Sequence, residues 1–213
     1  MIMTNKNVDY SLYLVTNRYD YSDKAFLQII TQACESGVTL LELREQDVTS
    51  KRYFELAKSV KQVTDRFDIP LIIDDRVDIC LAVDAAGVHV GDNDLPVYKV
   101  RQMIGPDKIL GVSVKDMARA IEAKEQGADY FGVGAIYPTK TKVITKHTSI
   151  ETLKNIAEQM NIPVNAIGGI KEDNISSLKN TGIAGVCMVS DIMQAPDVQT
   201  KVAHVLDQVK KIL

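Results

Sequence analysis

The sequence predicts a closed barrel of eight parallel strands, each followed by a helix: a TIM (β/α)₈ barrel. Short and almost wholly apolar runs alternate with helical segments about eight times along the chain. Strands of this composition are buried on both faces of a parallel sheet. The last apolar run is as hydrophobic as the first, which favours a sheet without edges over the alternative, an open doubly wound sheet. We expect one domain covering residues 1–213.

The expected strands are short, and glycine or polar residues follow them. They cover residues 12–16, 38–44, 70–73, 87–90, 108–112, 130–136, 163–167 and 185–189.

The expected helices lie between these strands. Asp23 is a candidate N-cap for the first helix and Thr49 or Ser50 for the second, while Gly37 and Gly127 are typical of helix ends. The helices cover residues 23–36, 50–67, a short segment after 76, 95–104, 116–126, 150–160, 171–179 and 198–213.

Composition excludes several classes of partner. The net charge of −3 gives no basis for binding nucleic acid or an acidic membrane surface. No apolar run approaches the roughly 20 residues that span a bilayer, and residues 1–9 lack the core of a signal peptide. Cys34, Cys80 and Cys187 lie far apart in apolar surroundings, as buried reduced thiols do. We therefore expect a cytoplasmic protein that binds small molecules; a homo-oligomer is compatible with the sequence.

The segment 137–142 has the most distinctive chemistry. Its sequence, Tyr-Pro-Thr-Lys-Thr-Lys, directly follows the apolar strand 130–136. Two hydroxyls and two ammonium groups fall within four residues, behind a proline that stiffens the start of the loop. These groups suit an anionic, phosphate-bearing ligand, although a solvated turn would have the same composition.

Many other polar residues also fall at strand ends. In a barrel of this type the carboxyl ends of all strands share one face, where active sites lie. We therefore expect these residues to converge on one site. They are Glu42, Arg44, Asp74, Asp75, Asp94, Ser113, Thr139, Thr141, Lys142, Gly168, Gly169 and Ser190.

Two of the carboxylates predict a magnesium site. Asp75 and Asp94 end consecutive strands, so their side chains can approach each other. Mg²⁺ prefers oxygen ligands and is often held by one or two carboxylates together with phosphate oxygens. The alternative is that Asp74 and Asp94 cap the following helices while Asp75 pairs with Arg76.

Other strand-end residues indicate phosphate binding. Gly168 and Gly169 follow the seventh strand and Ser190 follows the eighth, where such barrels often bind phosphate through backbone amides. Arg44 offers a bidentate fork to a diphosphate, unless it pairs with Glu42 or Asp74. We expect His89, between two valines, to be a packed and hydrogen-bonded core histidine.

Taken in order along nearly the whole chain, these strand-end segments resemble thiamine phosphate synthases. Most specific is the Tyr-Pro-Thr-x-Thr-Lys motif at 137–142. The resembling segments are 41–45 (Leu-Glu-Leu-Arg-Glu), 72–75 (Ile-Ile-Asp-Asp), 87–91 (Gly-Val-His-Val-Gly) with Asp94, 111–113 (Gly-Val-Ser), 135–142 and 166–170 (Ala-Ile-Gly-Gly-Ile).

The resemblance implies a transferase of thiamine biosynthesis that joins hydroxymethylpyrimidine diphosphate to a thiazole phosphate and releases diphosphate. For such a reaction the residue types predict a dissociative, Mg²⁺-assisted substitution without a protein nucleophile, since the chain offers no Cys–His or Ser–His pair that suggests one. The family's Mg²⁺ ligands fall on Asp75 and Asp94, and its catalytic residues on Arg44, Ser113 and Lys142. The substrate-binding positions fall on Glu42, Arg44, Asp74, Ser113, Thr139, Thr141, Lys142, Gly169, Val189 and Ser190.

Four positions depart from the family pattern. The family commonly has glutamine at position 42, lysine at 46, asparagine at 74 and glutamine at 92; this chain has Glu42, Gln46, Asp74 and Asp92. These changes remove a cation and add negative charge near the expected diphosphate. Lys115 and Lys140 are candidate replacements for that cation. A thiazole tautomerase and a non-catalytic phosphometabolite-binding barrel are the alternative functions.

Overall fold

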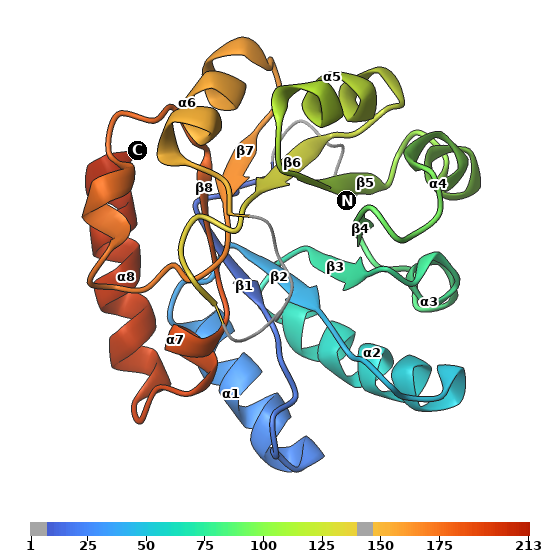
Figure 1. Ribbon diagram of the computed structural model, residues 1–213. Coiled ribbons are helices and arrows are strands. Elements are labelled where there is room, and N and C mark those ends of the chain that lie inside the picture. The colour runs from blue at the N-terminus through green and yellow to red at the C-terminus, as the bar shows by residue number, and fades with distance from the viewer. Residues whose placement is uncertain (1–7, 140–146) are drawn as a thin grey trace.

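The computed structural model describes residues 8–139 and 147–213. Eight parallel strands close into a barrel because β8 pairs with β1 as well as with β7. Figure 1 looks along this barrel, with the strands at the centre and the helices in a ring around them. The strands are β1 (Leu12–Val15), β2 (Leu40–Leu43), β3 (Leu71–Asp74), β4 (Gly87–Val90), β5 (Ile109–Val114), β6 (Tyr130–Val133), β7 (Val164–Ala166) and β8 (Gly185–Met188).

Helices follow the strands as predicted, which confirms the TIM-barrel fold class. Ser50 begins the second helix and Thr49 caps it by accepting a bond from the amide of Arg52. The helices are α1 (Asp23–Glu35), α2 (Ser50–Asp65), α3 (Val77–Ala82), α4 (Val97–Ile104), α5 (Met117–Glu125), α6 (Ile150–Gln159), the 3₁₀ helix η2 (Ile175–Leu178), α7 (Ser190–Met193) and α8 (Val198–Ile212).

Two local predictions were wrong. The segment 171–179 forms only the 3₁₀ turn η2, because the side chain of Asn174 accepts a bond from the amide of Lys171 and donates to the carbonyl of Gly169. The cap of α1 is Ser22 rather than Asp23, which instead pairs with Arg18. The short helix α7 was not predicted.

Side chains of the strands divide into two apolar layers, because successive residues of a strand point to opposite faces. The outer layer packs between the barrel and the helices. The inner layer fills the barrel; Tyr10, Tyr13, Ile72, Tyr130 and Cys187 belong to it. The inner layer thus fills the barrel interior beneath the carboxyl ends of the strands.

All three cysteines are free and buried, as predicted. Within the described part of the chain, no helix combines the length and the apolar character needed to cross a membrane. The cytoplasmic location stays a prediction.

The barrel closes tightly at the start of β8, and this closure can be tested by substitution. A Cβ atom on Gly185 would lie 1.8 Å from the carbonyl oxygen of Tyr10, a backbone atom that cannot move aside cheaply. We expect Gly185→Ala to lower the free energy of unfolding by about 3 kcal/mol, as overpacking of a core does. Urea unfolding measures this change.

The matched control is Gly91→Ala, where the nearest atom to an added Cβ is 3.4 Å away. This variant should unfold within about 1 kcal/mol of the original protein. Equal urea midpoints for both variants would contradict the close approach at Gly185.

Candidate active site

A cavity of about 370 Å³ opens at the carboxyl ends of the strands. Every predicted site residue that the structure describes lines this cavity, from β2 round to β8. They are Glu42, Arg44, Asp74, Asp75, Asp94, Ser113, Thr139, Gly168, Gly169, Val189 and Ser190. Lys140, Thr141 and Lys142 lie outside the described residues, so their predicted roles stay predictions.

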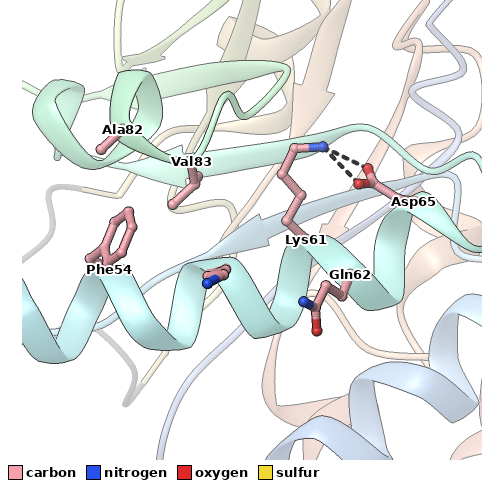
Figure 2. Close-up of a pocket in the computed structure, with 7 residues that line it drawn as sticks. Phe54, Lys61, Gln62, Asp65, Ala82 and Val83 are labelled. Carbon is pink, nitrogen blue, oxygen red and sulfur yellow. Dashed lines mark hydrogen bonds and ion pairs between the residues drawn. The ribbon is translucent and has the colours of Figure 1, made fainter.

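A second hollow, of about 270 Å³, lies on the outside of the barrel between α2 and α3 (Figure 2). Two of its charged groups are engaged with each other: Lys61 donates to both carboxylate oxygens of Asp65 at 2.8 Å. This i,i+4 ion pair is a common feature of helix surfaces. The strand-end cavity is therefore the candidate site.

The loops after β6 and β7 are fastened to each other at the cavity rim. The amide of Tyr137 donates to the carbonyl of Gly168 at 2.9 Å. Gly168 and Gly169 both have positive φ, and a Cβ on Gly169 would lie 2.6 Å from the carbonyl oxygen of Pro138. Glycine is thus required here by close backbone approach, and it brings the start of the 137–142 motif against the expected phosphate loop.

Asp75 directly follows β3 and Asp94 lies in the loop after β4, and both line the same cavity. Asp75 adopts the left-handed conformation with φ 60°, and its amide donates to the carbonyl of His89 at 2.8 Å. Such a backbone is uncommon outside glycine and is typical of functional sites. Asp94 accepts a bond from the amide of Gly91 at 2.7 Å. The alternative roles are not realised: α3 and α4 have no side-chain cap, and Arg76 pairs with Asp78.

Glu42 and Asp74 form a carboxyl pair at the base of the cavity. Glu42 is only 4% exposed, and burial raises its pKa to about 7. Burial likewise raises the pKa of Asp74 well above its usual value. The interaction between the two carboxyls lowers the pKa of Glu42 and raises that of Asp74, as expected if Asp74 donates a hydrogen bond to Glu42. Arg44 lies 3.4 Å from Asp74 and donates to Asn17 at 3.2 Å, which realises the predicted ion pair and also fixes the guanidinium at the cavity wall.

The lining side chains carry an excess of negative charge. Of the described residues, five acidic side chains and two basic ones line the cavity. The two basic groups and the raised pKa of Glu42 and Asp74 offset part of this negative charge among the described residues. No cluster of three or more His, Cys, Asp or Glu side chains suited to a metal occurs in residues 8–139 and 147–213. Two carboxylates with oxygen donors and this residual charge fit a hard divalent cation completed by phosphate oxygens.

Comparison with known proteins agrees with this geometry. The model of the family described as thiamine monophosphate synthase matches residues 12–192. The chain is 58% identical over 205 residues to a thiamine-phosphate synthase of Lacticaseibacillus paracasei, covering 96% of each chain. It is 57% identical over 202 residues to that of Enterococcus faecalis, covering 95% of each. A thiamine phosphate pyrophosphorylase from Pyrococcus furiosus superposes with a TM-score of 0.87 at 35% identity, covering 97% of this chain and 98% of that one.

The chain belongs to the thiamine monophosphate synthase family. The fold, the family and the thiamine phosphate synthase activity expected from the sequence are thereby confirmed.

Two of the departures from the family pattern have partners in this structure. Asp92 binds Lys115 at 2.7 Å, so the added negative charge at position 92 is neutralised within the cavity rim. Glu42 and Asp74 stand where the family commonly has two amides, and burial raises the pKa of both carboxyls, so that a protonated carboxyl can donate a hydrogen bond as an amide does. Gln46 is exposed and lines the cavity.

Sequence reasoning missed the polar residues beneath the cavity. Tyr13 and Tyr130 lie in apolar runs and gave no functional signal, yet both are hydrogen-bonded inside the barrel. His89 is buried and hydrogen-bonded, as predicted, but it also lines the cavity. The alternation of side chains along a strand could have identified these three residues. Their strand neighbours point outward into the outer apolar layer, so these three side chains point toward the barrel axis.

The raised pKa of Glu42 predicts a loss of stability with rising pH. Between the ordinary value of 4.5 and the folded value of about 7, the unfolded chain releases this proton and the folded chain keeps it. Stability is therefore full below pH 4.5, falls through this window and stays lower above it. Glu42→Gln cannot titrate, so the fall from pH 5 to pH 8 should shrink by on the order of 3 kcal/mol at most.

Urea unfolding in EDTA at the two pH values measures this difference. Glu151→Gln, on the exposed start of α6, is the control and should behave as the original protein does. The same fall in the Glu42 variant as in the original would show that this carboxyl does not keep its proton.

Proposed function

We propose that this protein joins hydroxymethylpyrimidine diphosphate to a thiazole phosphate, with Mg²⁺ held by Asp75 and Asp94. The observation that carries the proposal is that carboxylates, an arginine, hydroxyls and a glycine turn from successive strand ends line one cavity. When bound, Mg²⁺ would offset charge on the diphosphate and so improve it as a leaving group.

The remaining residues bind and orient the two substrates. Arg44, held by Asp74 and Asn17, offers its guanidinium to the diphosphate with little loss of side-chain freedom. Gly169 and Ser190, at the ends of β7 and β8, offer an amide and a hydroxyl to the phosphate of the thiazole. These contacts place the thiazole nitrogen against the methylene carbon that the diphosphate leaves.

We propose a dissociative substitution without a covalent enzyme intermediate. The electron-donating aminopyrimidine stabilises positive charge on its methylene carbon as diphosphate departs, and the thiazole nitrogen then forms the new bond. Cys187 is the thiol that lines the cavity among the described residues, and burial raises its pKa well above the usual value. A protonated thiol is a poor nucleophile. Isolation of an enzyme–pyrimidine adduct would contradict the proposal.

The direct experiment supplies the purified protein with both precursors and measures thiamine phosphate with and without Mg²⁺. Formation that depends on Mg²⁺ is the expected outcome. Binding of the substrates without turnover would favour a non-catalytic barrel, and conversion of a thiazole isomer alone would favour a tautomerase.

The proposed Mg²⁺ ligands can be tested by substitution. Asp75→Asn and Asp94→Asn each remove a charged ligand, and turnover should fall by about 10²-fold or more while the melting temperature stays close to the original. Asp78→Asn is the control, since this carboxylate pairs with Arg76 on α3 away from the cavity. Full activity of either cavity variant in EDTA would rule out this metal site.

Gln46 tests the assignment of the diphosphate position. Restoring the family's lysine adds a cation at the cavity rim, so Gln46→Lys should lower the KM for the pyrimidine diphosphate by about tenfold. The KM for the thiazole phosphate should stay nearly constant. Gln199→Lys, which adds the same charge on exposed α8, is the control.

Steady-state kinetics with each substrate varied in turn measures both constants. Identical KM values would mean that residue 46 points to solvent, and a higher KM would mean that the diphosphate lies elsewhere.

A further inference from the structure

A lysine on α8 joins the loop after β7 to the start of α7. Nζ of Lys201 lies 2.5 Å from a carboxylate oxygen of Glu172 and 3.5 Å from one of Asp191. Glu172 follows Gly169 in the loop after β7, and Asp191 directly follows Ser190. Helix α8 packs against α7, and Figure 1 shows the two helices side by side. Lys201 therefore links, from outside the barrel, the two segments whose Gly169 and Ser190 line the cavity.

The two segments are also bonded to each other directly. The backbone amide of Glu172 donates to Oδ2 of Asp191 at 2.9 Å. The same oxygen of Asp191 is the one that faces the ammonium group of Lys201. Hydrogen bonds to a charged carboxylate are stronger than those between neutral groups. Lys201 thus orients the carboxylate that holds the neighbouring loop by its backbone.

The sheet does not set the relative position of these segments. Pairing between β7 and β8 ends at Ala166 and Val186, before either segment begins. The side chain of Asn174 donates to the carbonyl of Gly169 at 3.0 Å, but this bond lies within the loop after β7. The spacing between the amide of Gly169 and the hydroxyl of Ser190 therefore depends on the contacts between the two segments.

Lys201 also offsets two negative charges behind the cavity wall. The carboxylates of Glu172 and Asp191 would repel each other and any phosphate bound in front of them. The hydrogen bond to Glu172 raises the pKa of Lys201, so its ammonium group stays charged. The side chains of Lys201, Glu172 and Asp191 are 24%, 28% and 19% exposed, so solvent screens their interaction only in part. His204 lies farther from Glu172, at 3.7 Å, and is 65% exposed.

We propose that Lys201 is a positioning residue for the phosphate of the thiazole substrate: it holds Gly169 and Ser190 at the spacing that lets both donate to one phosphate. The proposal rests on the function proposed above, which assigns that phosphate to these two residues. Lys201 acts through Glu172 and Asp191, and none of these three side chains is among the described residues that line the cavity. Donors that are fixed in advance lose little freedom when the phosphate binds.

The test replaces the ammonium group and keeps most of the side-chain stem. Lys201→Met should raise the Kd for the thiazole phosphate about tenfold, because the segments separate and two carboxylates are left without this cation. The Kd for the same thiazole without its phosphate should stay constant. Lys201→Arg keeps the charge and can reach both carboxylates with its fork, so it should restore the original affinity.

Isothermal titration calorimetry of the substrate-free protein with each thiazole measures these constants. Lys211→Met is the matched control, because Lys211 pairs with the carboxylate of Asp207 on an exposed turn of the same helix. This variant should bind as the original protein does. An unchanged Kd in Lys201→Met, or an equal loss for the thiazole without phosphate, would overturn the positioning role. Lys201→Gln is the second variant if the first does not fold.

Steady-state kinetics separates this role from a general loss of structure. In Lys201→Met the KM for the thiazole phosphate should rise about tenfold, while the KM for the pyrimidine diphosphate and kcat at saturation stay nearly constant. Parallel changes in both KM values would contradict a role confined to the thiazole phosphate.

Hydrogen exchange supplies a readout that needs no ligand. The amide of Glu172, bonded to Asp191, should exchange about tenfold faster in Lys201→Met and at the original rate in Lys211→Met. Unchanged exchange in Lys201→Met would overturn the link between the segments. An original protein that binds the thiazole phosphate but forms no thiamine phosphate would refute the proposed function and leave the role of Lys201 standing.

Discussion

Pairing of β8 with β1 is the constraint on which the rest of the structure depends. It removes both edges of the sheet, so every strand is buried on two faces and all eight carboxyl ends point to one rim. The carbonyl of Tyr10 takes part in this closure, since it accepts a bond from the side chain of Asn165 at 2.7 Å while Gly185 packs against it. Residues more than 100 positions apart thereby share one cavity.

Closure also brings several acidic side chains into one cavity. The cavity is lined, among the described residues, by more acidic than basic side chains. Burial opposes charge on Glu42 and Asp74 and raises the pKa of both carboxyls, so that protonation relieves the desolvation and the repulsion. Lys115 offsets Asp92 in the same way at the rim. A divalent cation at Asp75 and Asp94 would offset negative charge that remains on the cavity lining.

The inner layer of the barrel also contains hydrogen-bonded polar side chains. Two tyrosines and a histidine replace apolar side chains in it, and each polar atom is satisfied by the next. Such a network is stable only if every member has its partner, which ties the position of Ser113 to that of Glu42 across the barrel. Among the departures of this chain from its family, Glu42 belongs to this network, whereas Asp92 pairs with Lys115 at the rim.

The sequence by itself determined the fold, the family and the candidate site, because apolar periodicity marks the strands and strand-end polarity marks one face of a parallel barrel. It failed for the segment 171–179, where a side-chain turn at Asn174 outweighed helical propensity. Only the tertiary structure decided that burial raises the pKa of Glu42 and Asp74 and that Tyr13, Tyr130 and His89 form a chain of hydrogen bonds between Glu42 and Ser113. These contacts join residues up to 117 positions apart, and their strength comes from burial, which no local stretch of sequence specifies.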